Sequence, residues 1–229
     1  MSENKNMITA EGLAKLQKKL DEYLTVKRPE IAKRIQAARE LGDLSENADY
    51  DAAKEKQAKI EGLSEAEIAS KYIKAFEEAR EGVNSLKPTY QPRVTETMDD
   101  IIAFIEDLVD KGYAYEKDGD VFFRTSSVED YGTLSNQKMD DLKVGARIEE
   151  NDKKESPLDF VLWKQTEKGI KWPTKYSVGR PGWHTECVVM IDKIFGGIID
   201  IHGGGNDLKF PHHENEIAQS CALNHHTIA

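Results

Sequence analysis

The stretch from Gly197 to Leu223 constrains the fold more than any other part of the chain. A short apolar run, GIIDI, is followed by HGGG, and a helical pattern, PHHENEIAQSCAL, then begins at Pro211. A fully apolar run is typical of a strand buried in a parallel sheet. Glycines between a strand and a helix are typical of α/β proteins, and proline suits the first helical turn because no N–H is needed there. The stretch therefore predicts a strand, a glycine turn and a helix in an α/β domain.

The rest of the second half predicts the same mixture of helices and strands. The expected elements are a helix over 63–83, a proline-bearing loop over 85–96, an amphipathic helix over 97–112, a β-hairpin over 113–125 and a strand over 157–164. The hairpin has the clearest local pattern, because alternating apolar residues flank the dipeptide Asp118-Gly119, which favours a two-residue turn. We therefore assign residues 63–229 to an α/β domain.

The first part of the chain has a different pattern. Residues 9–61 predict helix throughout, with a narrow row of apolar side chains spaced three and four residues apart. This row contains Leu13, Leu16, Leu20, Tyr23, Leu24, Ile31, Ile35 and Ala38. We expect Pro29 to kink or interrupt the first helix, and the sequence LGDLSEN predicts a turn. Two helices joined by a short turn form an antiparallel hairpin, so residues 1–62 predict a projecting α-helical coiled-coil hairpin.

Composition argues against several classes of protein. The net charge of −10 argues against a free-standing nucleic-acid-binding protein, which usually has a basic face. No apolar run approaches the length of a membrane-spanning helix, and the polar N-terminus lacks the apolar core of a signal peptide. Two cysteines, Cys187 and Cys221, do not make a disulfide framework. We therefore expect a protein of the reducing cytoplasm.

Two histidines and a glutamate in the sequence PHHENE indicate a candidate metal site. In a regular helix His212 and Glu216 lie one above the other on one face, whereas His213 points about a quarter turn away. Cys187, in GWHTECVVM, offers a thiolate from elsewhere in the fold. Sulfur, nitrogen and oxygen donors together suit Zn²⁺. The alternative is a glutamate favoured by the helix dipole beside a surface histidine pair, and the spacing alone leaves both open.

Gly203, Gly204 and Gly205 lie between the predicted strand and the predicted helix. This is where α/β proteins bring backbone amides close to a nucleotide. The pattern is neither GxGxxG nor a phosphate-binding P-loop. A tight turn between the strand and the helix, with no ligand, therefore remains an open alternative.

Four stretches together resemble cysteinyl-tRNA synthetase, a class I aminoacyl-tRNA synthetase. They are DYGTLS, SPLDFVLWK, GRPGWHTEC and DIHGGGNDLKFPHHENEIAQS, and the resemblance runs from about residue 63 to the C-terminus. It implies an incomplete Rossmann-type domain with an inserted subdomain, and a cysteine–tRNA ligase activity that uses ATP with Mg²⁺ and tRNA(Cys). It also implies that Cys187, His212 and Glu216 are Zn²⁺ ligands, and that the zinc binds the thiolate of the substrate cysteine.

The same resemblance places further residues around the substrates. It implies that Trp183 packs on the bound cysteine, and that His202 and the loop after it face the adenylate. The loop residues assigned to ATP binding in this way are Gly203, Gly204, Gly205 and Asp207. A zinc–thiolate bond would reject serine without an editing site, because the serine hydroxyl cannot form the same bond at neutral pH.

Several features of the synthetase family do not occur in this sequence. The family has a fourth zinc ligand, a cysteine just before its first ATP signature, His-x-Gly-His, and neither is found here. The lysine-rich KMSKS loop and the anticodon-binding domain are also missing, since KMDDLK does not match that loop. Cys221 follows Glu216 by five residues and points off the ligand face, so we assign it to core packing. Because amino-acid activation depends on electrostatic stabilisation of the triphosphate, we expect that the chain alone does not charge tRNA.

The N-terminal part has a resemblance of its own. The sequence KRPEIAKRIQAARELGDLSENADYDAAKEKQAKIEG resembles the N-terminal coiled coil of a Gre-type transcript-cleavage factor, over about residues 7–62. The resemblance implies that the hairpin enters RNA polymerase, and that Asp43 and Glu46 at its tip help to hold a Mg²⁺ ion that activates water. Without the resemblance, the two acids would be interpreted as caps at the start of a helix.

Three interpretations of the whole chain follow from these patterns. The first is a ligase segment, residues 63–229, that recognises cysteine through zinc but does not complete the reaction. The second is a transcript-cleavage factor that acts through the hairpin of residues 1–62. The third is an inactive chimera of two incomplete parts.

Overall fold

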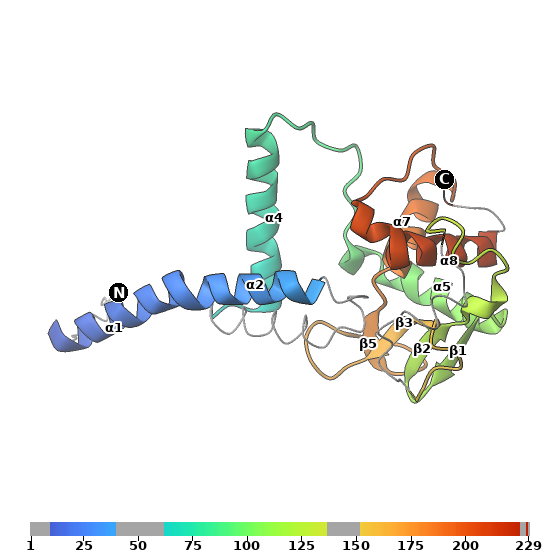
Figure 1. Ribbon diagram of the computed structural model, residues 1–229, viewed down its shortest axis with the longest axis horizontal. Coiled ribbons are helices and arrows are strands. Elements are labelled where there is room, and N and C mark those ends of the chain that lie inside the picture. Colours follow the sequence, from blue (N-terminus) through green and yellow to red (C-terminus); the bar gives the residue numbers. More distant parts are fainter. Residues whose placement is uncertain (1–9, 40–61, 137–151, 225–227, 229) are drawn as a thin grey trace, which may run out of the picture. The chain divides into compact units, whose positions relative to one another are not determined.

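The computed structural model describes residues 10–39, 62–136, 152–224 and 228. These residues belong to two compact units, Met1–Ser85 and Leu86–Ala229. In Figure 1 the first unit is blue to turquoise and the second is green to red. This division into units at residue 85 is based on packing alone. The boundary near residue 62 between the two family resemblances stays a prediction. No helix among the described residues is long and apolar enough to cross a membrane.

The first unit begins with one long helical segment. Helix α1 (Ala10–Glu22) continues through a π-helical turn (Tyr23–Lys27) into α2 (Arg28–Arg39). The regular α-helix is therefore interrupted beside Pro29, as expected, although the segment stays helical on both sides of the proline. The change lies just before it, where the Arg28 N–H donates to the Tyr23 carbonyl, five residues back, in place of the usual four.

The next described helix of this unit after α2 is α4 (Glu65–Gly82), which confirms the helix predicted over 63–83. It has its own start signal, a capping box in which Ser64 accepts the Glu67 N–H while the Glu67 carboxylate accepts the Ser64 N–H. The chain enters this cap through Gly62, whose φ of 63° is in the left-handed region. The predicted turn and second arm of the hairpin lie outside the described residues.

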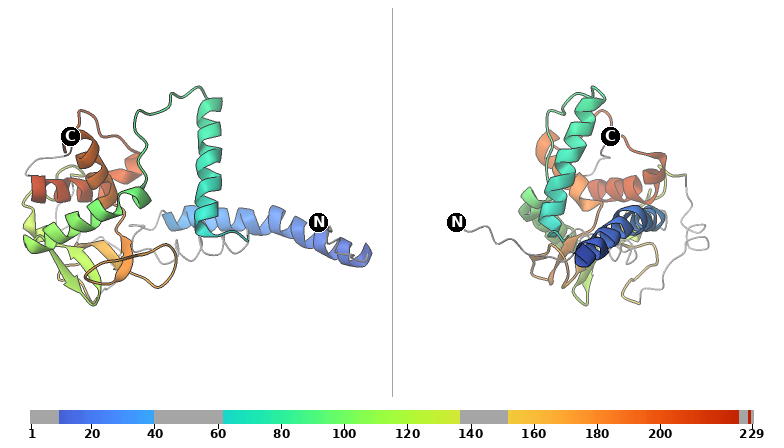
Figure 2. Two further views of the ribbon diagram at one scale, coloured as in Figure 1. Left: turned by 180° about the vertical axis from the view of Figure 1, so that it is seen from behind. Right: turned by 90° about the vertical axis from the view of Figure 1, so that its left-hand side faces the viewer.

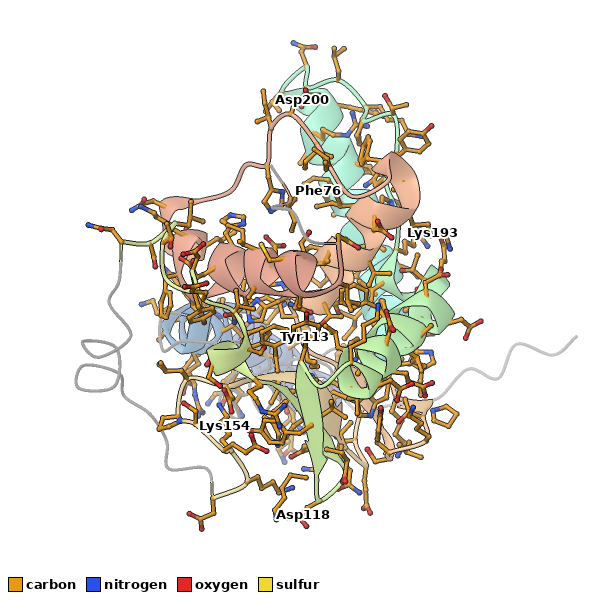
Figure 3. All side chains as sticks on the ribbon, turned by 90° about the vertical axis from the view of Figure 1, so that its right-hand side faces the viewer. Phe76, Tyr113, Asp118, Lys154, Lys193 and Asp200 are labelled. Carbon is orange, nitrogen blue, oxygen red and sulfur yellow. The ribbon has the colours of Figure 1, made fainter. Side chains whose placement is uncertain are left out.

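The second unit opens with the amphipathic helix and hairpin that the sequence predicts. Helix α5 (Met98–Asp110) is followed by β1 (Ala114–Lys117) and β2 (Asp120–Phe123), which pair antiparallel. Asp118 and Gly119 join the strands with φ of 49° and 80°, as a type I′ turn requires. Figure 3 shows Asp118 at the outer tip of this hairpin.

The described strands form one five-stranded sheet in the order β1-β2-β3-β5-β4, and every pair is antiparallel. The remaining strands are β3 (Phe160–Gln165), β4 (Trp172–Pro173) and β5 (Val178–Pro181). Strand β3 confirms the strand predicted over 157–164. Gly179 and Gly182 allow β5 to lie close to β3, because a Cβ on either would come within 2.2 Å of a β3 carbonyl oxygen.

The strand predicted at GIIDI does not form in the described chain. The backbone from Ile198 to Gly205 carries no strand pairing, and Ile198 and Ile201 are 60% and 86% exposed. A strand needs a neighbour to accept and donate its backbone hydrogen bonds, and the described sheet offers none here. The parallel-sheet expectation is therefore wrong for the described residues, although the mixture of helix and sheet is as predicted.

One core holds the second unit together. Helices α5, α7 (Thr185–Phe195) and α8 (Glu214–Asn224) lie on the same side of the sheet (Figures 1 and 2). The buried core residues are Met98, Ile101, Ile105, Leu108, Ala114, Val121, Phe123, Tyr131, Phe160, Leu162, Trp163, Val189, Ala218 and Ala222. These side chains come from three helices, three strands and the loop residue Tyr131, so the ends of α7 and α8 that face each other are held in a fixed arrangement.

Candidate metal centre

The candidate site forms where three segments of the second unit meet. Strand β5 leads directly into α7, which carries Cys187 in its first turn. The exposed loop after α7 passes Asp200, labelled at its outer end in Figure 3, and returns towards α8. A π-helical turn (Lys209–His213) precedes α8 and carries His212, while Glu216 lies in the first turn of α8 itself.

The structure brings together the three side chains that the sequence proposed as zinc ligands. Cys187 Sγ lies 3.9 Å from His212 Nε2, and His212 Nε2 lies 3.1 Å from Glu216 Oε1. The donor atoms of all three side chains are within 4.8 Å of one another. His212 and Glu216 are buried and Cys187 is half-buried. The helical spacing argument for His212 and Glu216 therefore holds, although the regular α-helix begins only at Glu214.

The chemistry of this group fits a bound cation. Glu216 Oε1 is fully buried and accepts no geometrically regular hydrogen bond from the described residues, although His212 Nε2 lies 3.1 Å away. A buried carboxylate oxygen without a donor is costly unless another positive group satisfies it. A zinc ion would satisfy Oε1 and would use the sulfur of Cys187 and the nitrogen of His212 at the same time. The residues present therefore fit Zn²⁺.

The protonation of the two acidic members also depends on their surroundings. Burial alone raises the pKa of Glu216, but three neighbouring histidines, His212 foremost, outweigh burial and lower the pKa to about 2. Burial and the negative charge of Glu216 raise the pKa of the Cys187 thiol. Without a cation, Cys187 is therefore a neutral thiol beside an ionised carboxylate. A coordinated thiol is deprotonated by the ion's charge, so metal binding would release a proton from Cys187.

The orientation of His212 is set by residues at the start of α7. His184, which is fully buried, places its Nδ1 atom 2.8 Å from His212 Nδ1. One of these nitrogens donates and the other accepts, so this contact leaves His212 Nε2 facing Cys187 and Glu216. Trp183 stacks on the same imidazole, with ring centroids 4.2 Å apart. Trp183 thus lies beside the ligand group, and its packing on bound cysteine stays a prediction.

The second oxygen of Glu216, Oε2, contacts two further histidines. His202 Nε2 lies 2.6 Å from Oε2, and His213 Nδ1 lies 2.8 Å from the same oxygen. The expectation that His213 points away from the ligand face is therefore wrong. His213 and Glu216 are three residues apart, a spacing that brings two side chains together on a helix just as a spacing of four does. His202 contacts the Glu216 carboxylate, and its contact with an adenylate stays a prediction.

The glycine loop after His202 is open to solvent. Gly203, Gly204, Gly205 and Asp207 are all exposed, and a short 3-10 helix (Asn206–Leu208) connects the loop to the π-helical turn. Gly204 lies against His213, because a Cβ built on Gly204 would be 2.5 Å from His213 Nε2. A side chain at residue 204 would therefore collide with the His213 ring, so this position in the described structure requires glycine. A role of the loop in ATP binding stays a prediction.

Two further residues of the PHHENE sequence were not predicted to matter. The buried Glu214 carboxylate accepts backbone N–H groups from Gly132 and Ser135, at 2.9 and 2.8 Å. Asn215 Oδ1 accepts the hydroxyl of Tyr131. Glu214 and Asn215 thus tie the start of α8 to the DYGTLS segment. The signal in the sequence was the density of polar residues in PHHENE, which exceeds what one metal site needs.

The remaining predicted residues lie elsewhere. Cys221 is half-buried and is not among the core residues, and it belongs to neither group of potential metal donors found among the described residues. Asp43 and Glu46, the proposed catalytic acids of the hairpin tip, lie outside the described residues. Buried His184 was also missed, although its position between Trp183 and Cys187 in GWHTEC could have indicated a supporting role.

The amino-acid sequence is similar to a known protein family and to individual relatives. A family model described as "tRNA synthetases class I (C) catalytic domain" matches residues 13–229. A cysteine–tRNA ligase of Staphylococcus carnosus strain TM300 is 58% identical over 175 residues, which are 76% of this chain and 38% of that protein. Cysteine–tRNA ligases of Staphylococcus aureus strain MRSA252 and of Staphylococcus saprophyticus are each 59% identical, over 164 and 163 residues, or 71% of this chain and 35% of each relative.

The chain therefore spans between a third and two fifths of the length of the relatives it matches. The family match begins at residue 13, so it also crosses most of the segment that resembles a Gre-type hairpin. These matches do not show a coiled-coil hairpin or a transcription-factor relationship. The match over nearly the whole chain, together with the high identity to three ligases, leads to one conclusion: this chain belongs to the family of class I (C) tRNA synthetase catalytic domains.

Proposed function

We propose that this chain is a cysteine–tRNA ligase-type catalytic segment whose specific task is to recognise cysteine through zinc. Cys187, His212 and Glu216 would hold the ion. The observation that supports this most directly is Glu216 Oε1, a buried carboxylate oxygen that accepts no geometrically regular hydrogen bond from the described residues and lies beside a thiol and an imidazole nitrogen. The three relatives are cysteine–tRNA ligases, which supports the same proposal.

The bound zinc would supply a Lewis-acid position for the thiolate of substrate cysteine. The residues of this chain prepare that position. His184 holds His212 with Nε2 towards the site, and Trp183 covers the imidazole ring. His202 and His213 hold the Glu216 carboxylate from its other oxygen. Substrate selection then depends on a bond that cysteine forms and serine does not.

We extend the proposal to the other substrates of the relatives' reaction. ATP with Mg²⁺ would lie along the exposed loop of Gly203, Gly204, Gly205 and Asp207, next to His202. The open backbone of this loop is compatible with close approach of a nucleotide. The tRNA(Cys) partner, the ATP-dependent activation step and a cytoplasmic location are likewise proposals that rest on the relatives.

Binding of free cysteine tests this proposal directly. Zinc-loaded protein is titrated with cysteine and with serine in a calorimeter. We expect cysteine to bind at least about a hundredfold more tightly than serine. Cys187→Ser should abolish this preference, because a ligand of the ion is lost, whereas Cys221→Ser is the matched control and should retain it. Equal binding of the two amino acids by the zinc-loaded protein would contradict the proposal.

A second candidate function concerns residues 1–62. Leu13, Leu16, Leu20 and Leu24 are all about half exposed along α1 and the turn after it. Such an apolar row favours pairing with another helix, as the resemblance to a Gre-type transcript-cleavage factor would provide. The function would then be cleavage of RNA in a stalled RNA polymerase complex through Asp43 and Glu46.

Transcript cleavage by a backtracked polymerase complex tests that second candidate. We expect the chain to stimulate cleavage and Asp43→Ala with Glu46→Ala to abolish it. The paired control is Asp21→Ala with Glu22→Ala, which removes two acids from the end of α1 and should leave cleavage unchanged. Cleavage that is absent, or is lost equally in both double variants, would contradict this candidate. Failure of both the cleavage and the cysteine-binding experiments would favour the inactive chimera.

A further inference from the structure

We propose that the Glu216 carboxylate serves two cation positions, and that His202, His213 and Glu216 Oε2 form the second. This position would take a divalent ion of the borderline class, such as Zn²⁺ or Co²⁺, through two nitrogens and one oxygen. The inference rests on the proposed function for the first position, at Cys187, His212 and Glu216 Oε1. Its own donors are separate except for the shared carboxylate.

The geometry of Glu216 carries the proposal. Its two oxygens face different groups: Oε1 faces His212 and Cys187, and Oε2 faces His202 and His213. The donor atoms of His202, His213 and Glu216 lie within 4.8 Å of one another, as do those of the first group. A carboxylate placed between two such groups can bridge two ions, which in two-metal sites lie about 3.5–4 Å apart.

The three donors of the second position come from two segments, the loop after α7 and the continuous helical run that ends in α8. His202 belongs to the loop after α7, His213 to the π-helical turn and Glu216 to α8. Glu216 is fully buried, while His202 and His213 are partly buried. The position thus lies towards solvent from the first one, where an ion can enter. Without a cysteine, this N/N/O set is harder than the first set and suits an ion that retains water ligands.

Gly204 supplies an independent sign that the loop is shaped around His213. A Cβ on Gly204 would lie 2.5 Å from His213 Nε2 and 3.1 Å from its Cε1. The ring therefore lies against the loop backbone on one side and presents Nδ1 to Glu216 on the other. A methyl group at residue 204 would force His213 to move, and the second donor group would be disrupted without any change in a ligand residue.

Cobalt titration separates the two positions in one experiment. Metal-free protein is titrated with Co²⁺, and bound metal is counted while the near-ultraviolet thiolate-to-cobalt band is recorded. We expect two equivalents per chain, of which only one produces the thiolate band. In His213→Gln and in Gly204→Ala the band should remain, while affinity for the equivalent without the band falls at least about tenfold. Cys221→Ser is the control and should keep both equivalents.

Each outcome decides between the proposals. One equivalent in the original chain, with the thiolate band, overturns the second position and leaves the proposed function intact. It would mean that His202 and His213 only hydrogen-bond the carboxylate. Two equivalents without a thiolate band overturn the proposed zinc ligand set but support the second position. In Cys187→Ser, a bound equivalent that is then lost in the double variant with His213→Gln also supports it. Circular dichroism of each variant verifies that it is folded.

Discussion

Both units of this chain contain regular α-helices, but the two units bury very different numbers of helix side chains. In the first unit, α4 buries none of its side chains, and Ile31 is the one buried apolar residue among those described. In the second unit, α5 alone buries four residues against the sheet and α7. The contrast shows that a local pattern with a capping box is enough to form α4. A group of metal donors, by contrast, forms where several elements share a core. Every potential metal donor group of the described residues lies in the second unit.

The largest expected effect comes from the same aromatic deletion made in each unit. Phe123 is fully buried in β2 and stacks on Phe160, whereas Phe76 in α4 is 60% exposed. We expect Phe123→Ala to lower the free energy of unfolding of the second unit by about 3–5 kcal/mol. Phe76→Ala should change that of the first unit by less than about 1 kcal/mol. Urea denaturation followed by fluorescence and circular dichroism measures both. Equal losses of unfolding free energy in the two variants would contradict the difference in burial between the units.

A buried carboxylate of the second unit gives the next largest effect. Asp159 accepts the N–H and hydroxyl of Thr125, the N–H of Ser156 and the hydroxyl of Tyr115. Asp159→Ala leaves several of these donors unpaired, and each buried unpaired donor costs about 1–3 kcal/mol. We expect a loss of at least about 2 kcal/mol in urea denaturation. Exposed Asp152→Ala is the control, with a change within about 0.5 kcal/mol. A similar result for both would show that this network contributes little.

The cap of α4 tests what local interactions alone supply in the first unit. Ser64→Ala removes the hydroxyl that accepts the Glu67 N–H, and caps of this kind contribute about 1 kcal/mol. We expect faster amide hydrogen exchange in the first turn of α4. Ser70→Ala is the control, because Ser70 lies inside the helix and donates to the Ala66 carbonyl, so exchange should not increase. An unchanged first turn in Ser64→Ala would mean that other contacts hold the start of α4.

The smallest effect is expected on the apolar row of α1. Leu20 is 56% exposed, so Leu20→Ala should change stability by no more than about 0.5 kcal/mol. The matched deletion in the second unit, Leu108→Ala, removes a fully buried side chain of α5 and should cost about 2–5 kcal/mol. Thermal unfolding of both variants gives the comparison. A loss above about 2 kcal/mol for Leu20→Ala would reveal a partner helix over the row, as the predicted hairpin requires.

Predictions from local pattern succeeded where one segment contains all the necessary information. The Asp118-Gly119 turn, the amphipathic helix α5 and strand β3 follow from residues close together in the chain. Prediction failed where a partner was needed. The GIIDI run has the composition of a buried strand, but the described sheet supplies no strand to pair with it, and Ile201 is exposed. Hydrophobicity predicts that a segment can be buried, not that a neighbour is present.

The candidate site shows the same division at the level of single residues. Spacing of four residues placed His212 and Glu216 together correctly, because both lie on one helical face. The three-residue spacing of His213 and Glu216 favours the same contact, and the expectation that His213 points away overlooked it. No spacing argument could have brought His184 to His212, since 28 residues separate them in the chain.

The sequence by itself therefore determined the mixed α/β class, the local elements of the second unit and the identities of the proposed zinc ligands. The motifs that carry the family resemblance are contiguous, and their chemistry is set by residue type. The tertiary structure alone decided that the Glu216 carboxylate is buried and is contacted by three histidines, His202, His212 and His213. The reason is physical: burial and the contacts of a carboxylate depend on segments that are distant in sequence and meet only when the core of α5, α7, α8 and the sheet has packed.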